Sequence, residues 1–512
     1  MSLAKTFSVG LYGLSGTIIE VETDISSQLP SFSLVGLPDA SLSEATARVR
    51  AACTNSGFGF PSKKVLVNLS PAAVPKSGSA FDLSIAVSIL AANDAVPKSA
   101  LDQICFIGEL GLDGSLRQVP GVLPMVMHAR NCGFTRVICP LGNLSEASMV
   151  EGIGVLGALN LKSLANWLNG KGYLEQPSSL APVATPEGVI GMDLSQVIGQ
   201  NQAVEGLIVA AAGGHHIAMV GAPGAGKTML AERLPGILPA LSTEQALEVA
   251  AIESIAGNGQ IALRLDTAPR FQAPHHSAST AALIGGGTGV PRPGAVSKAH
   301  HGVLFLDEAL EFHGHSLDSL REPLESGRVL INRSGGSAVF PAKFQLVLAA
   351  NPCPCGLSGL ADRDCTCTAM AIRRYTNRLS GPVLDRIDIR LNIKPVSLGA
   401  NLGLFDVGPS TTQALTRVAA ARLASAERLD SFGYRLNSEV PGPLLRGRLG
   451  IGEKALKDLN RMLVTGKTSM RGYDRCLRLA WTIADLEGQQ KPGVDQVRIA
   501  VSLRGSDNLL GV

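Results

Sequence analysis

The chain has 512 residues, of which 45% are hydrophobic and 17% charged, a composition that supports several packed domains and excludes a disordered chain. The formal net charge is only +3, which excludes a polycationic, histone-like binder of nucleic acid. No uninterrupted apolar run reaches the length of a transmembrane helix, so we expect no membrane association and a cytoplasmic location.

Residues 1–170 alternate strand-like and helix-like runs. The patterns predict strands at 65–69 and 137–139 and helices at 81–92 and 161–168. Residues 171–190 are rich in proline, serine and alanine, which predicts a linker.

Residues 191–395 alternate strands and helices with glycine-rich turns, the pattern of an α/β layer fold. A connector is expected at 396–429, with a helical run at 412–429. Residues 430–512 form the last predicted domain, in which 450–512 indicates two or three amphipathic helices.

A phosphate-binding loop is the strongest motif. The eight residues that fit G-x-x-x-x-G-K-[ST] are Gly221, Ala222, Pro223, Gly224, Ala225, Gly226, Lys227 and Thr228. Small residues allow the backbone N–H groups to surround phosphates, Lys227 would contact the β- and γ-phosphates, and Thr228 would bind Mg²⁺. A predicted strand at 217–220 and a helix at 229–234 flank the loop, so we expect an ATP and Mg²⁺ site.

Two further strands are expected to end in polar residues. The apolar run 303–306 ends at Asp307 and Glu308, where Asp307 would hold Mg²⁺ and Glu308 would polarise the attacking water. The run 344–349 leads to Asn351, which could orient that water. Open α/β sheets bind ligands at the carboxyl ends of their strands, so the pattern predicts a nucleotide hydrolase.

Four of the nine cysteines, Cys353, Cys355, Cys365 and Cys367, lie within fifteen residues. Four thiolates can complete a tetrahedral Zn²⁺ site, although the C-x-C spacing also suits free or redox-active thiols. The nearby basic residues suggest a zinc-ordered loop facing nucleic acid; they are Arg363, Arg373, Arg374 and Arg378.

These motifs, in this order, resemble the AAA+ ATPases and, more narrowly, the magnesium-chelatase-like ComM/YifB family. The most specific stretches are AAAGGHHIAMVGAPGAGKTMLAERLPGILP (211–239), APHHSASTAALIGGG (273–287), HGVLFLDEALEF (301–312), AANPCPCG (349–356) and SGPVLDRIDI (380–389). The resemblance implies an α/β and α+β multidomain fold with an AAA+ core at 191–395 and a C-terminal helical lid at 430–512.

The resemblance also implies roles for two arginines. Arg386 matches the arginine finger that reaches the neighbouring subunit's γ-phosphate, and the alternative is a surface ion pair with Asp385 or Asp388. Arg471 matches the sensor-2 arginine of the lid, with Arg475 and Arg478 as nearby alternatives. The segment that contains Ile198 is similar to the one bordering the adenine. A finger that acts on a neighbour implies a ring, expected to be a hexamer.

Residues 1–170 resemble the C-terminal domain of Lon protease, of the ribosomal-S5-domain-2 type. The nucleophile position of that protease falls on Ala80, and its catalytic lysine position falls on Leu123. A Ser–Lys dyad needs a lysine within hydrogen-bond reach of the serine. We therefore expect this fold without protease chemistry.

The family-specific segment with His275 and His276, followed by Gly285–Gly287, has two interpretations. It could project into the ring's pore and move a polymer, or it could be a polar loop packed between subunits.

The resemblance implies an ATP-driven motor on single-stranded or branched DNA, a branch-migration helicase of natural transformation. The alternative is a magnesium-chelatase-type motor that remodels a metal-insertion partner. The net charges of residues 1–170, 171–429 and 430–512 are −1, 0 and +4, so contacts with DNA would be local and would favour the lid.

Overall fold

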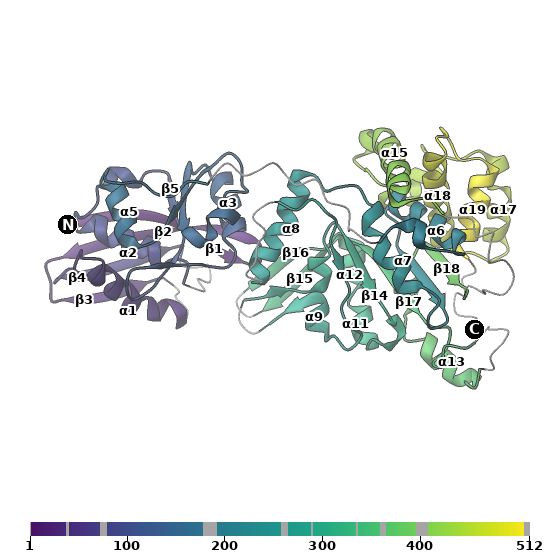
Figure 1. The fold of residues 1–512 in the computed structure, drawn as a ribbon, viewed down its shortest axis with the longest axis horizontal. Coiled ribbons are helices and arrows are strands. Elements are labelled where there is room, and N and C mark those ends of the chain that lie inside the picture. The colour runs from purple at the N-terminus through teal and green to yellow at the C-terminus, as the bar shows by residue number, and fades with distance from the viewer. Residues whose placement is uncertain are drawn as a thin grey trace.

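The computed structural model describes residues 2–36, 40–71, 79–177, 192–257, 265–287, 290–333, 336–358, 365–395 and 408–505. Figure 1 shows three parts in a row: an N-terminal sheet with its helices, a second sheet with its helices, and a group of C-terminal helices. Within the described ranges, none of the helices has the length and apolar character needed to cross a bilayer.

The N-terminal sheet has seven strands in the order β3-β4-β2-β1-β5-β8-β9. A long antiparallel hairpin, β1 with β2, forms its centre. The strands are β1 (Ser2–Tyr12), β2 (Ser15–Ser26), β3 (Ser31–Val35), β4 (Lys64–Ser70), β5 (Ile104–Phe106), β8 (Arg136–Pro140) and β9 (Gly154–Ala158), with a separate short ladder of β6 (Glu109–Leu110) and β7 (Leu116–Arg117). The strands predicted at 65–69 and 137–139 are confirmed as β4 and β8.

Five helices accompany this sheet: α1 (Ala40–Asn55), α2 (Asp82–Ala92), α3 (Val122–Asn131), α4 (Leu144–Ala147) and α5 (Leu161–Leu168). Helix α2 is buried along its whole length, as expected of a helix that is apolar all round. The helices predicted at 81–92 and 161–168 are confirmed as α2 and α5.

The second sheet has five parallel strands in the order β11-β14-β17-β10-β18. They are β10 (Ile217–Gly221), β11 (Phe271–Gln272), β14 (Val303–Leu306), β17 (Gln345–Ala350) and β18 (Ile389–Ile393). Every residue of β10, β14 and β17 is buried, because a parallel sheet is covered on both faces. The strands predicted at 217–220, 303–306 and 344–349 are confirmed.

The helices of this second part are α6 (Asn201–Gly213), α7 (Lys227–Arg233), α8 (Thr243–Ala256), α9 (Thr280–Ile284), α10 (Ala295–Lys298), α11 (Gly314–Asp318), α12 (Arg321–Ser326), α13 (Ala369–Thr376) and α14 (Gly381–Leu384). Two antiparallel ladders join them: β12 (Gly285–Gly286) with β13 (Arg292–Pro293), and β15 (Arg328–Arg333) with β16 (Gly336–Pro341). The sequence analysis did not predict the β15–β16 hairpin.

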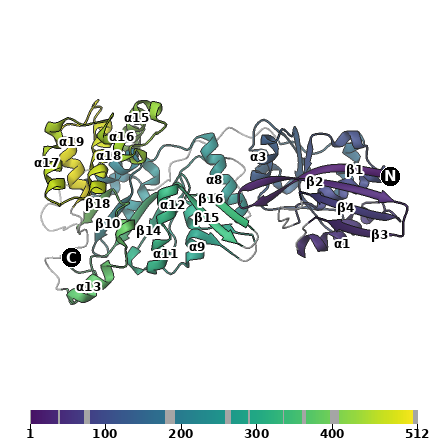
Figure 2. The same cartoon turned by 180° about the vertical axis from the view of Figure 1, so that it is seen from behind.

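The N-terminal part packs directly against the second part. The Tyr12 hydroxyl donates to the Gly336 carbonyl of the hairpin at 3.0 Å, and Figure 2 shows the hairpin between the two sheets. Helix α3 packs on α8, where Leu247 and Ala251 share an apolar cluster with Val122 and Val126. The contact buries apolar side chains, so it is a structural junction rather than a loose tether.

The C-terminal helices are α15 (Thr411–Leu429), α16 (Gly442–Arg446), α17 (Glu453–Val464), α18 (Met470–Leu486) and α19 (Val494–Arg504). The expectation of two or three helices after residue 450 is confirmed. Helix α15 packs on α6 and α18, so the helical part of the expected connector belongs with the helical group. Several positions of the sequence analysis lie outside the described residues: 75–78 beside the former nucleophile position, linker residues 178–190, Arg363, and connector residues 396–407.

A buried polar network joins the second sheet to the C-terminal helices. His215 contacts Asp388 through Nδ1 at 2.9 Å and the Thr482 hydroxyl through Nε2 at 2.8 Å. Arg475 pairs with the other Asp388 oxygen. Burial acts to raise the pKa of Asp388, but Arg475 and His215 hold that pKa well below its ordinary value. The carboxylate therefore remains ionised and holds α18 against the start of β18.

We expect the substitution Asp388→Ala to lower the free energy of unfolding by about 3–5 kcal/mol, because it leaves a buried guanidinium without its partner. Since the folded pKa lies below the unfolded value of about 3.9, this stabilisation is present above that pH and is lost as pH falls through the folded pKa. Thermal and denaturant unfolding at pH 7 measure the effect. The control Asp385→Ala breaks the exposed pair with Arg471 and should change stability by less than about 1 kcal/mol; equal losses would contradict the assignment.

Candidate functional site

The carboxyl ends of neighbouring strands bring the sequence-predicted residues together. Strands β14, β17 and β10 are adjacent and parallel, so the residues after them emerge at one edge of the sheet. Lys227 follows the loop after β10, Asp307 follows β14 directly, and Asn351 follows β17 directly. This edge is called the carboxyl edge below.

Lys227 is buried at the centre of the carboxyl edge. Its Nζ donates to the carbonyls of Gly221 at 2.7 Å and Ala222 at 2.9 Å, and to Asn351 Oδ1 at 3.1 Å. Burial lowers the pKa of Lys227, while Asp307 and Glu308 act in the opposite direction. The structure thus holds the ammonium group among oxygen acceptors that a phosphate can replace.

The loop before Lys227 depends on glycine. Gly224 and Gly226 have φ values of 77° and 91°, which only glycine adopts without strain. A Cβ at Gly221 would lie 2.3 Å from the Ile393 carbonyl of the neighbouring strand β18. These positions account for three of the motif's glycines.

Two carboxylates stand beside the loop. The Thr228 hydroxyl donates to Asp307 Oδ2 at 2.9 Å, which places a hydroxyl and a carboxylate, both hard oxygen ligands suited to Mg²⁺, side by side. The Glu308 N–H donates to Asp307 Oδ1 at 2.9 Å. Glu308 has a left-handed backbone conformation with φ of 49°, an uncommon state for a residue other than glycine.

Ile198 lies near the same edge. Its segment follows a 3₁₀ turn at Leu194–Gln196, and Gln200 Nε2 donates to the Lys394 carbonyl just after β18 at 2.6 Å. The Ile198 side chain is 51% exposed. It therefore offers an apolar surface close to the carboxyl edge.

The two predicted arginines lie at the opposite, amino edge of the sheet. Arg386 precedes β18 and Arg471 begins α18, and both line a cleft of about 1180 Å³ between the sheet and the C-terminal helices. The five residues of β10 span roughly 16 Å, so Arg386 does not reach the phosphate loop of its own chain. The structure does not bring Arg386 and Arg471 together with Lys227.

The ion pairs in this cleft correct one sequence-based alternative. Arg386 pairs with Glu325 of α12 at 2.6 Å, not with Asp385 or Asp388. Those two carboxylates pair with Arg471 and Arg475.

Among the three arginines considered for the lid, Arg471 is the exposed one. Its side chain is 74% exposed, whereas Arg475 is held by Asp388 and Arg478 donates to the Val440 carbonyl at 2.8 Å. Arg471 is therefore the arginine that remains accessible from outside the chain.

Family models match three segments. Residues 21–143 match "Subunit ChlI of Mg-chelatase", residues 193–400 match "Magnesium chelatase, subunit ChlI", and residues 408–504 match "Magnesium chelatase, subunit ChlI C-terminal". The last match includes α15, in agreement with its packing.

Similar proteins match the chain over almost its whole length. A protein of Mycobacterium tuberculosis is 49% identical over 504 residues, which are 98% of this chain and 99% of that protein. YifB of Escherichia coli is 40% identical, covering 100% and 98%, and the competence protein ComM of Haemophilus influenzae is 39% identical, covering 100% and 99%. The chain belongs to the magnesium-chelatase-like ComM/YifB family. Membership implies an AAA+ ATPase that uses ATP and Mg²⁺.

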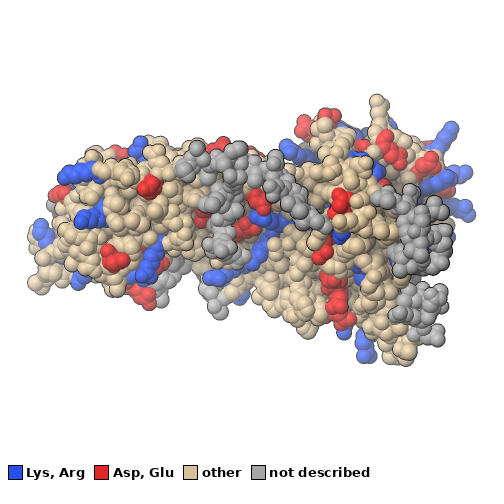
Figure 3. All heavy atoms as spheres, in the orientation of Figure 1, with Lys and Arg blue, Asp and Glu red and all other residues tan. Residues whose placement is uncertain are grey.

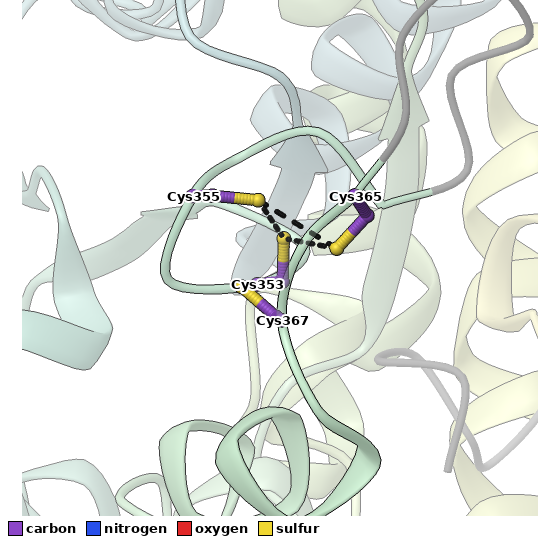
Figure 4. A group of neighbouring side chains, drawn as sticks. All are labelled: Cys353, Cys355, Cys365 and Cys367. Atoms are coloured by element: carbon purple, nitrogen blue, oxygen red, sulfur yellow. Dashed lines mark hydrogen bonds between the residues drawn. The ribbon is translucent and has the colours of Figure 1, made fainter.

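The four clustered cysteines of this ComM/YifB chain converge in space. Their Sγ atoms all lie within 4.8 Å of one another, and Figure 4 shows Cys353, Cys355 and Cys365 joined in a triangle with Cys367 beside it. The sides of the triangle are 3.3, 3.7 and 3.6 Å. A tetrahedron with Zn–S bonds of about 2.3 Å has S–S edges of roughly 3.8 Å, so the four thiols fit a zinc ion.

Local hydrogen bonds prepare one of these thiols. Donation from the Leu357 backbone N–H, and then from Cys353, lowers the pKa of Cys355 to about 6. The Ser358 N–H is directed at Cys353 Sγ at 3.3 Å. Backbone N–H groups that point at sulfur stabilise thiolates, the form that binds metals.

A second group, Glu248 with His300 and His301, resembles a metal site but does not fit one. Both histidines contact Glu248 Oε2 through Nε2, at 3.0 and 2.8 Å. His300 Nδ1 accepts from the Lys343 N–H at 3.0 Å, so the neutral ring carries its proton on Nε2 and donates it to Glu248. Burial, and then His301, lowers the pKa of His300 to about 4. The group is a hydrogen-bonded junction.

The two positions of the former protease dyad meet in an apolar environment. Ala80 and Leu123 are 7% and 0% exposed and belong to the same cluster of buried side chains. Neither side chain can supply a nucleophile or a base. Nearby, Ser79 donates to Glu109, and no lysine contacts that hydroxyl among the described residues.

Sequence reasoning missed one contact at the carboxyl edge. His276 Nδ1 lies 2.9 Å from Glu308 Oε2. The predicted order of strands, with β11 beside β14, was the signal that could have suggested it.

Proposed function

We propose that this chain is an ATP-driven motor ring that acts on DNA, a branch-migration helicase of natural transformation. The observation that carries the proposal is the division of the catalytic groups between the two edges of one sheet. A carboxyl edge that holds phosphate and Mg²⁺, and an amino edge that presents arginines, complete a site only when two copies meet. The N-terminal region 1–170 then decorates the ring without protease chemistry, and the protein acts in the cytoplasm.

The carboxyl edge would carry the chemistry. Lys227 exchanges its bonds to the loop carbonyls for the β- and γ-phosphates, and Thr228 with Asp307 binds Mg²⁺. Glu308 accepts a proton from the water that attacks the γ-phosphorus, while the bond from that phosphorus to the β-phosphate oxygen breaks. Asn351 orients the water, and Ile198 borders the adenine.

The amino edge of the next subunit would complete the site. Its cleft contains Arg386 and Arg471 with few competing partners, since Glu325 and Asp385 are exposed carboxylates. A guanidinium stabilises the charge that develops in phosphoryl transfer. Contacts between unlike surfaces generate closed rings, and we propose a hexamer.

Mixing two inactive variants tests this division. Arg386→Ala should lower turnover by about 10³-fold or more, and Glu308→Gln should stop turnover while ATP still binds. Each interface of a ring joins one subunit's carboxyl edge to the next subunit's amino edge, so a 1:1 mixture should regain about a quarter of wild-type turnover. Steady-state phosphate release measures this. A mixture no more active than its components would show that Arg386 serves its own chain.

DNA is proposed as the substrate because a relative of full length is a competence protein. Figure 3 shows Lys and Arg side chains scattered among Asp and Glu over the face in view, which agrees with local rather than broad contacts. The exposed basic residues of the C-terminal helices are candidates for such contacts; they include Lys454, Lys457, Arg461 and Lys467.

We expect the purified protein with ATP and Mg²⁺ to bind single-stranded DNA and to move a three- or four-way DNA junction. Gel-resolved conversion of a labelled junction measures this, with Lys227→Ala as the matched inactive control. Protein that hydrolyses ATP but leaves every junction unmoved would exclude the helicase. It would favour the alternative, a chelatase-type motor that remodels a metal-insertion partner, for which the matching family models speak.

We further propose that Cys353, Cys355, Cys365 and Cys367 bind a structural Zn²⁺, since their spacing fits the tetrahedron. Freshly reduced protein should contain about one zinc ion per chain by elemental analysis. The double variant Cys355→Ser/Cys367→Ser should lose it. The exposed Cys132 lies outside the group, so Cys132→Ser should retain it. Wild-type protein without zinc would leave the redox-thiol interpretation.

A further inference from the structure

His276 lies against the carboxylate to which the proposed function assigns the attacking water. Its Nδ1 is 2.9 Å from Glu308 Oε2, and the two side chains are 36% and 50% exposed. The contact follows from the sheet, because β11 pairs in parallel with β14 and the segments after both strands emerge side by side. An imidazole at this distance occupies one oxygen of Glu308 and favours one orientation of its side chain.

The backbone of Glu308 is itself strained. Its φ and ψ are 49° and 44°, a left-handed conformation that disfavours residues with a Cβ. It is held by the Glu308 N–H bond to Asp307 and by the Glu311 N–H bond to the Glu308 carbonyl at 2.7 Å. Such conformations persist where surrounding contacts enforce them, and they concentrate at switching sites.

The segment that carries His276 reaches a second, basic surface. It continues into α9, whose first turn is capped by Ser279, and ends at the left-handed Gly285–Gly287. Gly286 pairs with Arg292 across the short ladder, and a Cβ on Gly286 would lie 3.4 Å from Arg333 Nη2. Arg292 and Arg333 are both exposed.

One end of the segment 273–287 thus touches Glu308, and the other lies beside two guanidinium groups. Exposed guanidinium groups are strong ligands for the phosphates of nucleic acids. Glycines at the basic end leave the backbone free to move when a ligand arrives.

We propose that His276 is a positioning residue that restrains Glu308 in the free enzyme, and that DNA phosphates bound by Arg292 and Arg333 release it. The inference rests on the proposed hydrolysis of ATP at Glu308. His276 therefore sets the basal rate of turnover and couples that rate to the polymer, without itself touching ATP.

Removal of the restraint provides the test. His276→Ala should raise turnover without DNA on the order of tenfold, the scale of one charge-assisted contact, through kcat with KM for ATP unchanged. Addition of a single-stranded oligonucleotide should then accelerate turnover little further. His276→Asn, whose amide N–H can face Glu308, should restore a low basal rate. His315→Ala, at an exposed histidine of α11, is the matched control and should behave as wild type.

The basic end of the segment is tested separately. Arg333→Ala should lose the acceleration by the oligonucleotide, and the double variant with His276→Ala should match His276→Ala alone, because nothing remains to be released. Arg333→Ala that keeps its acceleration would overturn the release by phosphate.

The results separate this inference from the proposed function. A wild type that turns over ATP, beside His276→Ala with an unchanged or lower basal rate, overturns the restraint and leaves the ATPase intact. A wild type without turnover overturns both. Glu308→Gln should stay inactive in the His276→Ala background; residual turnover there would show that the added activity comes from elsewhere.

Discussion

The parallel pairing of β14, β17 and β10 is the constraint on which the candidate site depends. Strands that run side by side in one direction end at one edge, so Lys227 meets Asn351 and Thr228 meets Asp307. If β17 ran the other way, its amide would lie at the opposite edge, a strand length away. The fully apolar strands hold this arrangement, because a slipped strand would bury the polar residues that follow it.

The same direction of pairing explains why the site is incomplete in one chain. Arg386 stands before β18, so it lies at the amino edge for the same reason that Asn351 lies at the carboxyl edge. The buried Asp388 network then fixes α18 on that edge, and Arg471 shares the cleft. A sheet that separates its phosphate site from its arginines requires a second copy to join them, which is the logic of a ring motor.

The loops of the carboxyl edge are packed against one another, so their functions are linked. The cysteine loop follows Asn351, and a Cβ at Gly356 would lie 2.5 Å from Pro223 of the phosphate loop. On the other side, the segment after β11 touches Glu308. Metal ordering of one loop and polymer binding at another would both bear on the position of the catalytic groups.

The sequence by itself determined the elements and residues with local signatures. Buried strands read as apolar runs, so β4, β10, β14 and β17 could be predicted, together with Lys227, Asp307 and Asn351 just beyond three of them. Tertiary structure alone decided which distant groups meet: Glu325 with Arg386, His276 with Glu308, α15 with α18, and the β15–β16 hairpin with Tyr12. These contacts join positions far apart in the chain, and their geometry depends on how layers pack, which local patterns do not encode.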